Sequence, residues 1–286
     1  MARVLSGTEV VDALNQSVSA KVEALRAEGI IPTLACVRVG ERGDDIAYER
    51  GAIKSAAKVG VEVQSLVFPQ DISQEALIKQ IENLNADAAI HGILLFSPLP
   101  AHLDQKAVGE ALAVEKDIDG ICARSLAGVF SDTHEGFAPC TPSACMEIID
   151  YYGIDVKGKH VVVVGRSLVV GKPLAMMLLE RHATVTICHS RTLDLAAVTQ
   201  GADILIACVG RKKVIDERYL SEGQVVIDVG INVDEDGRIV GDVDFEAALK
   251  KVGAITPVPG GVGTVTTKVL IKHVVEAASK SHMLHE

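Results

Sequence analysis

The chain has 286 residues and a formal net charge of −10 at pH 7, from 28 Lys and Arg against 38 Asp and Glu. This charge repels nucleic acid and anionic membrane surfaces, so we predict neither as a partner. Hydrophobic residues make up 48% and charged residues 23%, a balance typical of a globular protein with a sizeable core. Aromatic residues make up only 3% and Trp is absent, so the core is expected to be aliphatic.

Targeting and metal-binding signals are absent from the sequence. The N-terminus lacks an apolar stretch ahead of a cleavage site, and no apolar run approaches the roughly 20 residues of a membrane helix. We therefore predict a cytoplasmic protein. Six scattered cysteines without a CxxC pair are expected to act as small apolar side chains, so neither disulfides nor a metal site is predicted.

The first half alternates amphipathic stretches with short β-branched runs. In chain order the patterns predict a helix over 6–28, a strand over 34–39, a helix over 46–59, a strand over 61–68, a helix over 74–84 and a strand over 90–96. Ser6 can cap the first helix, and Gly29 with Pro32 ends it. The last strand ends at Ser97-Pro98, because proline cannot donate to a central ladder.

The second half repeats this alternation. It predicts a helix over 141–152, a strand over 159–164, a helix over 173–181, strands over 184–188, 204–209 and 225–229, and a helix over 264–278 that could pack back on the first block. Such alternation is typical of parallel sheets. We predict an α/β fold of two α/β domains, residues 1–140 with the returning helix 265–286, and a Rossmann-like domain over 141–264.

A candidate phosphate site follows the strand over 159–164. Gly165-Arg166-Ser167 and Gly171 separate this strand from a helix, so backbone N–H groups and the helix N-terminus can bind phosphate. The spacing fits GxGxxG only in part. Arg166 can bind a ribose phosphate, and Ser190-Arg191 stand where NAD sites usually carry an acidic residue, so both features favour NADP. Otherwise, the two arginines are solvated loop charges.

Three further features stand out, and the first two have two interpretations each. The glycine-rich loop over 256–264 lets backbone approach a ligand closely, or is only a tight connection. Asp117 and Asp119 can bind a heterocycle or exchange protons, or form a solvated turn. Tyr48 and Ala52 are one helical turn apart, so they lie on the same face.

Together these motifs resemble the bifunctional methylenetetrahydrofolate dehydrogenase/cyclohydrolase family from near the start of the chain to its last helix. The matching segments are Val39-Gly40 with Tyr48, and the ranges 97–100, 116–120, 139–142, 164–167, 170–173, 188–190, 228–231 and 257–263. The resemblance implies an N-terminal folate domain, a Rossmann-like NADP-binding domain, a tetrahydrofolate one-carbon substrate and a homodimer.

The resemblance also implies roles for individual residues. Tyr48 matches the residue that packs against the folate rings, and Asp119 the residue that holds the pterin. The loop Pro259-Gly260-Gly261 matches the lip over substrate and nicotinamide. The positions that match NADP contacts are Gly165, Arg166, Ser167, Ser190 and Ile231.

The chain departs from the family at its catalytic positions. The family carries a Lys where this chain has Ala52, a Gln where it has Phe96, and Pro-Met where it has Thr264-Val265. Lys54 lies about 240° around the helix from Tyr48, so it is not placed to replace that Lys. The Lys serves proton transfer in hydrolysis and the Gln tunes it. We therefore predict NADP-dependent oxidation of 5,10-methylenetetrahydrofolate to 5,10-methenyltetrahydrofolate in one-carbon metabolism, with weak or absent cyclohydrolase activity.

Three alternatives remain open at the level of sequence. A bifunctional enzyme would also hydrolyse methenyltetrahydrofolate to 10-formyltetrahydrofolate, with Lys54 or a bound water replacing the missing Lys. A non-catalytic relative would only bind nucleotide or folate. A dehydrogenase for another small substrate is compatible with Phe96 and Thr264.

Overall fold

The computed structural model describes residues 1–283. The chain divides into two compact units, unit 1 with residues 1–12 and 141–266, and unit 2 with residues 13–140 and the chain from residue 267 onward. The sequence-based boundaries had placed residues 1–12 in the N-terminal domain. They lie in unit 1, where strand β1 (Arg3–Val4) pairs in parallel with β11 (Ala254–Ile255).

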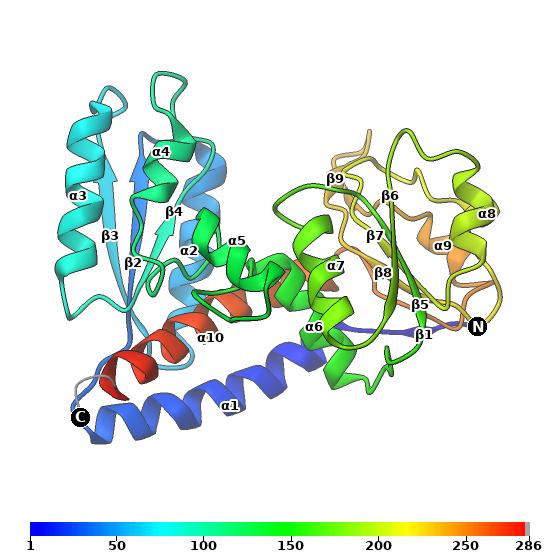
Figure 1. The fold of residues 1–286 in the computed structure, drawn as a ribbon, viewed down its shortest axis with the longest axis horizontal. Coiled ribbons are helices and arrows are strands. Elements are labelled where there is room, and N and C mark those ends of the chain that lie inside the picture. The colour runs from blue at the N-terminus through cyan, green and yellow to red at the C-terminus, as the bar shows by residue number, and fades with distance from the viewer. Residues whose placement is uncertain (284–286) are drawn as a thin grey trace. The chain divides into compact units, whose positions relative to one another are not determined.

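Unit 2 contains a three-stranded parallel sheet in the order β3-β2-β4. The strands are β2 (Thr33–Val39), β3 (Glu62–Phe68) and β4 (Gly92–Leu95). Helix α3 (Gln74–Ala86) covers one face and α2 (Gly43–Ala57) covers the other (Figure 1). Because side chains alternate between the faces of a strand, Ala35 and Val37 join the aliphatic core with α3, whereas Arg38 contacts α2.

Four more helices lie wholly or mostly in unit 2. They are α1 (Gly7–Ala27), α4 (Gln105–Glu110), α5 (Ala123–Phe130) and α10 (Val262–Met283), of which α1 and α10 begin in unit 1. The predicted apolar stripe of α1 is buried, including Leu14, Val18 and Val22. Near the chain end, the side chains of Lys21 and Glu276 form an exposed ion pair between α1 and α10.

Unit 1 contains a six-stranded parallel sheet in the order β1-β11-β8-β7-β5-β6. Its longer strands are β5 (His160–Val164), β6 (Thr184–Cys188), β7 (Ile204–Ala207) and β8 (Val225–Asp228). Strand β5 lies between β6 and β7, so the strand order reverses there. In open parallel sheets, ligands bind outside the carboxyl ends of the strands at such a reversal.

The remaining elements of this part of the chain are short. They are α6 (Cys140–Tyr151), α7 (Gly171–Glu180), α8 (Leu195–Gln200), a 3₁₀ helix over Glu217–Tyr219, α9 (Phe245–Ala248), and a hairpin of β9 (Asn232–Val233) and β10 (Ile239–Val240). Buried aliphatic residues such as Val162, Leu205 and Val226 form the core.

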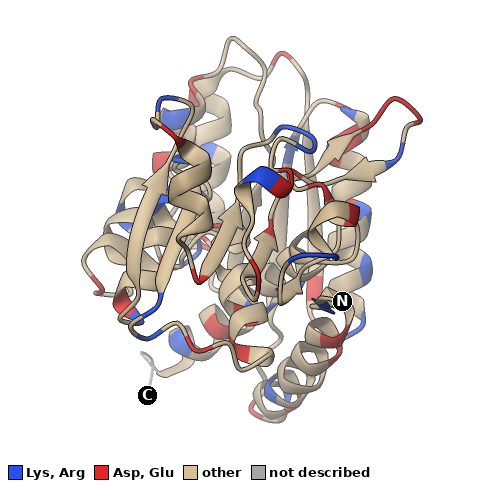
Figure 2. Cartoon of the chain, turned by 90° about the vertical axis from the view of Figure 1, so that its right-hand side faces the viewer, with Lys and Arg blue, Asp and Glu red and all other residues tan. Residues whose placement is uncertain are grey.

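The predicted α/β fold is confirmed, with parallel sheets and a C-terminal helix whose later residues join the first block. Helix and strand ends differ from the predicted ones by a few residues. Charged residues lie mainly on helices and loops, and the strands are largely uncharged (Figure 2). Within residues 1–283, no helix combines the length and apolar character needed to cross a membrane.

Candidate functional site

The predicted phosphate turn lies at the carboxyl edge of the sheet in unit 1. It joins β5 to α7, and the N–H of Gly165 donates to the carbonyl of Cys188 at 2.9 Å, next to the end of β6. A side chain at Gly165 would overlap Cys208, and one at Gly171 would overlap the backbone of Gly165. The turn therefore requires glycine at both positions, and bare backbone lines it.

The polar side chains of this edge divide into structural and available groups. Ser167 accepts a hydrogen bond from the N–H of Val170 at 3.1 Å, which fixes the turn before α7. Arg166 and Arg191 are exposed, and within residues 1–283 neither guanidinium forms an ion pair or a hydrogen bond. Ser190 is exposed beside Arg191. Both arginines are thus free to bind an anionic ligand.

A pocket of about 230 Å³ opens in the same unit, at the carboxyl end of β8. Residues 228–231 and 257–264 line it together with Ile239. Ile231, which is 66% exposed, and the Pro259-Gly260-Gly261 loop therefore lie in one cavity, although nearly thirty residues separate them along the chain.

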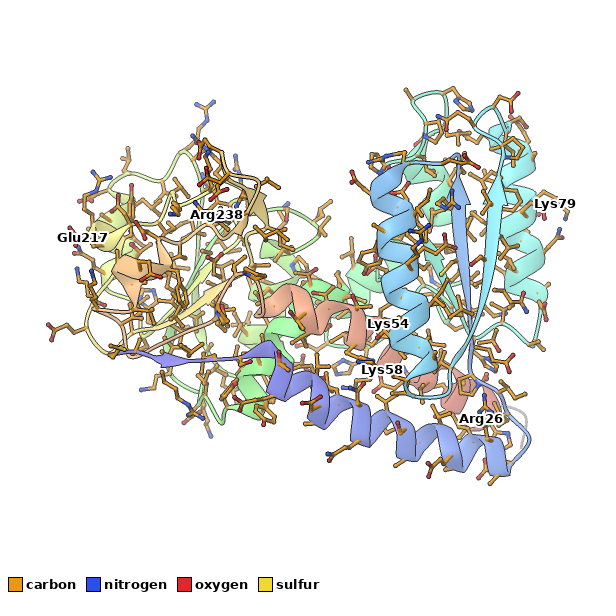
Figure 3. The ribbon with its side chains drawn as sticks, turned by 180° about the vertical axis from the view of Figure 1, so that it is seen from behind. Arg26, Lys54, Lys58, Lys79, Glu217 and Arg238 are labelled. Carbon is orange, nitrogen blue, oxygen red and sulfur yellow. The ribbon has the colours of Figure 1, made fainter. Side chains whose placement is uncertain are left out.

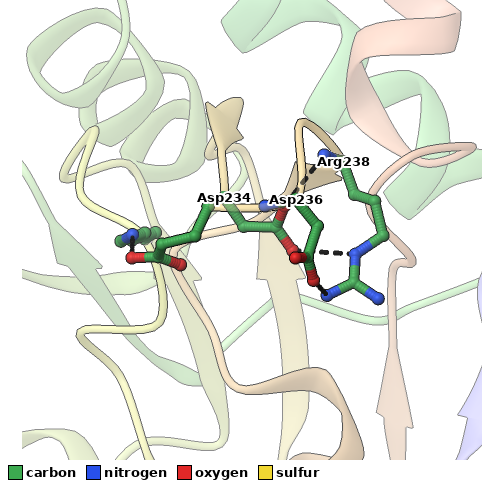
Figure 4. Close-up of polar contacts among 5 residues, drawn as sticks. Asp234, Asp236 and Arg238 are labelled. Carbon is green, nitrogen blue, oxygen red and sulfur yellow. Dashed lines mark hydrogen bonds and ion pairs between the residues drawn. The ribbon is translucent and has the colours of Figure 1, made fainter.

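An ion-paired turn supports one wall of this pocket. Ile239 follows Arg238, which donates from Nε to Asp234 at 2.9 Å and from Nη2 to Asp236 at 2.5 Å (Figure 4). The backbone N–H of Arg238 also donates to the Asp234 carboxylate. These bonds close the turn between β9 and β10, so the partly exposed Ile239 is held at the pocket.

Two buried carboxylates that the sequence analysis did not single out as a pair lie beneath these loops. Asp228 accepts hydrogen bonds from the N–H groups of Gly230, Asp242 and Val243 at 2.9 to 3.0 Å. Burial raises the pKa of Asp228 to about 6, despite these three donors. Asp242 accepts four hydrogen bonds in turn, from the backbone of Val209, Gly210 and Arg211 and from the Asn232 amide.

The predicted folate residues Tyr48 and Asp119 belong to unit 2, Tyr48 on α2 and Asp119 in the segment between α4 and α5. The Tyr48 ring meets Phe96 edge to face, with centroids 6.0 Å apart. Tyr48 also hydrogen-bonds Thr267 of α10, and burial together with the negative charge of Asp119 raises its pKa. Ala52 is fully buried on the adjoining turn of α2. Tyr48 thus has an apolar neighbour on the sheet side.

The two predicted carboxylates have different environments. Asp117 is fully buried and accepts from Ile121, Cys122 and the Ser125 hydroxyl, so it anchors the start of α5. Asp119 hydrogen-bonds both the side chain and the backbone of Cys140. Burial raises the pKa of Asp119 to about 6. Of the pair, Asp117 is fully buried and Asp119 is partly exposed.

A buried ion pair beside Tyr48 was missed by the sequence analysis. Arg38 at the end of β2 donates from Nε to Glu49 of α2 at 3.1 Å, and both side chains are at least nine-tenths buried. The second carboxylate oxygen of Glu49 is buried and has no hydrogen-bond partner within residues 1–283. The available signal was an arginine in the otherwise apolar segment 34–39.

Two lysines near this site have different surroundings. Lys54 is exposed on α2 (Figure 3), as its helical position predicts. Lys268 of α10 is 7% exposed and donates to the backbone carbonyl of Ser55 at 3.0 Å. Its ammonium therefore contacts the C-terminal turn of α2, because α2 ends at Ala57.

Comparison with known proteins identifies the family. Residues 5–119 match the tetrahydrofolate dehydrogenase/cyclohydrolase catalytic domain, and residues 139–282 match the NAD(P)-binding domain of the same enzymes. The chain belongs to the tetrahydrofolate dehydrogenase/cyclohydrolase family. The resemblance inferred from the motifs is thereby confirmed, and the NAD(P)-binding match spans the turn over 165–171 and the pocket over 228–264.

Individual members of the tetrahydrofolate dehydrogenase/cyclohydrolase family align over nearly the whole chain. The bifunctional protein FolD of Carboxydothermus hydrogenoformans is 52% identical over 279 residues, 97% of each chain. That of Clostridium botulinum is 48% identical over 281 residues, 98% of this chain and all of the relative. A crystal structure of the bifunctional enzyme from Campylobacter jejuni superposes with a TM-score of 0.95 at 36% identity, covering 98% of this chain and 99% of its own.

A further structure of this family bears on the cofactor. The Trypanosoma brucei dehydrogenase-cyclohydrolase, complexed with NADP and an inhibitor, superposes with a TM-score of 0.91 at 35% identity over 98% of each chain. That protein binds NADP. In the present chain, the open glycine turn and the unpaired guanidiniums of Arg166 and Arg191 fit a phosphorylated dinucleotide.

Proposed function

We propose that the protein oxidises 5,10-methylenetetrahydrofolate to 5,10-methenyltetrahydrofolate with NADP as hydride acceptor, and that it hydrolyses the methenyl product weakly or not at all. The observation that carries the proposal is the environment of Tyr48. At the two positions where the family carries Lys and Gln, its neighbours are the fully buried Ala52 and the ring of Phe96. Neither side chain can transfer a proton.

The residues of unit 1 would hold NADP. The backbone of the turn over 165–171 would bind the pyrophosphate, and Arg166 with Arg191 would bind the ribose phosphate. Ile231 and the Pro259-Gly260-Gly261 loop, which line one pocket of unit 1, would contact the cofactor. NADP supplies the hydride-accepting ring when it is bound.

In unit 2, Asp119 would hold the pterin and Tyr48 would pack against the folate ring system. Hydride loss leaves a cation that the lone pairs of the folate nitrogens stabilise, so this step needs positioning and no protein base. Hydrolysis differs, because water must attack and a proton must move. A well-placed acid or base contributes typically about 10²–10⁴-fold to such a step. The dehydrogenase therefore tolerates Ala52 and Phe96 better than the cyclohydrolase does.

The second candidate is a bifunctional enzyme, which the names of the relatives at 48% and 52% identity favour. Hydrolysis to 10-formyltetrahydrofolate would then use an acid or base at a position other than Ala52 and Phe96. In both cases we propose a cytoplasmic homodimer, as the family resemblance implies, which size-exclusion chromatography with light scattering would test.

A paired assay separates these candidates. We expect NADPH formation from 5,10-methylenetetrahydrofolate and loss of methenyltetrahydrofolate close to its spontaneous rate. The double substitution Ala52→Lys with Phe96→Gln should raise the catalysed loss at least about tenfold, because it restores a proton-transfer group. Ile53→Lys is the matched control, since it adds the same charge to the exposed face of α2.

Each alternative has its own outcome in this assay. Rapid loss of methenyltetrahydrofolate with the unmodified protein would establish the bifunctional enzyme. Tight NADP binding without NADPH formation would indicate a non-catalytic relative. No gain from the double substitution, in a folded variant, would show that the loss of hydrolysis has another cause.

A further inference from the structure

We infer that Asp242 is a positioning residue for dinucleotide binding. It does not contact the dinucleotide, but it holds two backbone turns beside the proposed site. The inference rests on the proposed use of NADP in unit 1. Asp242 is fully buried in the segment that follows β10, and it connects two turns at the carboxyl edge of the sheet. One turn follows β7 and the other follows β8.

The first turn binds the Asp242 carboxylate with three successive backbone N–H groups. Val209 and Gly210 donate to Oδ2 at 2.6 and 2.9 Å, and Arg211 donates to Oδ1 at 2.9 Å. Converging N–H groups of this kind form an anion-binding concavity. In this protein a side-chain carboxylate occupies the concavity, so it is closed to a phosphate.

This turn is adjacent to the proposed phosphate site. The N–H of Cys208 donates to the carbonyl of Val164 at 2.9 Å, and a side chain at Gly165 would overlap Cys208. The residue that precedes the Asp242-bound turn therefore packs against the first glycine of the turn over 165–171. Because the Asp242 carboxylate occupies the turn after β7, a phosphate cannot bind there. The neighbouring turn over 165–171 stays open to the phosphate.

The second turn carries Ile231, which lines the pocket. Asp242 Oδ1 also accepts from the side-chain amide of Asn232 at 2.9 Å, and any side chain at Gly230 would overlap the Asp242 carboxylate. Asp228 fixes the same segment from the other side, because it accepts from the N–H groups of both Gly230 and Asp242. The position of Ile231 thus depends on Asp242.

Removal of the carboxylate should weaken NADP use selectively. We expect Asp242→Ala to raise KM for NADP at least tenfold and to change KM for 5,10-methylenetetrahydrofolate less than twofold. Formate at millimolar concentration should restore much of the NADP affinity, because it can re-enter the vacated concavity. Inorganic phosphate, which is larger, should inhibit the variant competitively with NADP more than it inhibits the unmodified protein.

Two variants keep the inference testable. Asp244→Ala is the matched control, because this residue caps α9 two positions away and does not bind either turn. It should lower Tm without changing KM for NADP. Asn232→Ser removes one donor from Asp242 and leaves the backbone donors in place, so it should raise KM for NADP two- to fivefold even if Asp242→Ala does not fold.

The outcomes separate this inference from the proposed function. An unmodified protein that forms no NADPH would contradict the proposed function. An active protein whose folded Asp242→Ala and Asn232→Ser variants keep the normal KM for NADP would overturn the role of Asp242. Equal increases in both KM values, with no rescue by formate, would also overturn it, because they would indicate a general loss of structure.

Discussion

Asp119 is the partly exposed member of the predicted carboxylate pair, and its pKa is raised. Burial raises its pKa to about 6, with a further increase from the negative charge of Asp117, while its hydrogen bond to Cys140 acts in the opposite direction. The proposed contact with the pterin requires the ionised carboxylate as hydrogen-bond acceptor. Affinity for reduced folate should therefore be constant above about pH 7 and fall as pH decreases through 6.

Binding of a stable 5-deazatetrahydrofolate at pH 5, 6, 7 and 8 would measure this dependence. At pH 5 the affinity should be about tenfold lower than at pH 8, because one proton must be released for each ligand bound. Asp119→Asn should bind weakly at every pH. Binding of NADP to the same samples is the control, and a reduced-folate affinity that stays constant down to pH 5 would refute the role of Asp119.

Individual residues differed in how far the sequence could predict them. Tyr48 and Asp119 could be proposed from the sequence because a motif marks each of them. Arg38 and Glu49 are only eleven positions apart, but their ion pair depends on the packing of α2 on β2, which no local pattern specifies. Asp242 binds a turn that begins 33 residues earlier in the chain, so these contacts became visible only in the folded structure.

At the scale of elements, periodicity predicted the long helices and strands, because each buries a face with a regular repeat. The β1 and β11 strands escaped prediction, since two residues cannot show alternation. Because β1 pairs with β11, residues 1–12 belong to unit 1, and the boundary differs from the predicted one. Helices α4, α8 and α9 were not predicted either, because six residues or fewer are too short to show a helical repeat.

Helix α2 shows how a neighbouring element stabilises a helix end. The last carbonyls of a helix lack partners within it, and cations are favourable there. Lys268 donates to Ser55 in that last turn, but burial and the positive charge of Lys58 lower its pKa to about 8. The ordinary pKa of a lysine is 10.5, so the ammonium of Lys268 is less favourable in the folded protein than in the unfolded chain.

The pH dependence of stability follows from this shift. Between about pH 8 and 10.5 the unfolded chain binds a proton at Lys268 that the folded chain has released, so stability rises with pH across this window. Relative to Lys268→Met, the free energy of unfolding of the unmodified protein should increase by up to about 3 kcal/mol from pH 8 to 10.5.

Urea unfolding of the unmodified protein and Lys268→Met at several pH values would give the difference between their free energies of unfolding. The contributions of the other titrating groups cancel in this difference. Lys58→Met is the second variant. It should move the window upward, because it removes the neighbouring positive charge that lowers the pKa of Lys268. A difference between the unmodified protein and Lys268→Met that is independent of pH would contradict the prediction.

At the scale of the whole molecule, a net charge of −10 must be reconciled with two anionic ligands. The structure suggests that local pairing resolves this conflict. Several cations are neutralised by neighbouring carboxylates, as Arg218 is by Asp216 and Arg238 is by Asp234. Arg166 and Arg191 have no such partner within residues 1–283, so their charge remains available at the carboxyl edge of the sheet in unit 1.

The free guanidiniums make a prediction about cofactor choice. A hydrogen bond to a charged group contributes about 1.5–3 kcal/mol, so Arg166→Ala should raise KM for NADP by roughly 10- to 100-fold. KM for NAD should change less than about twofold, because NAD lacks the ribose phosphate that the guanidinium binds. Arg218→Ala is the matched control, since it removes another exposed cation, which is already paired with Asp216. Equal use of both cofactors by the unmodified protein, or an equal loss with both in Arg166→Ala, would exclude Arg166 as the group that selects NADP.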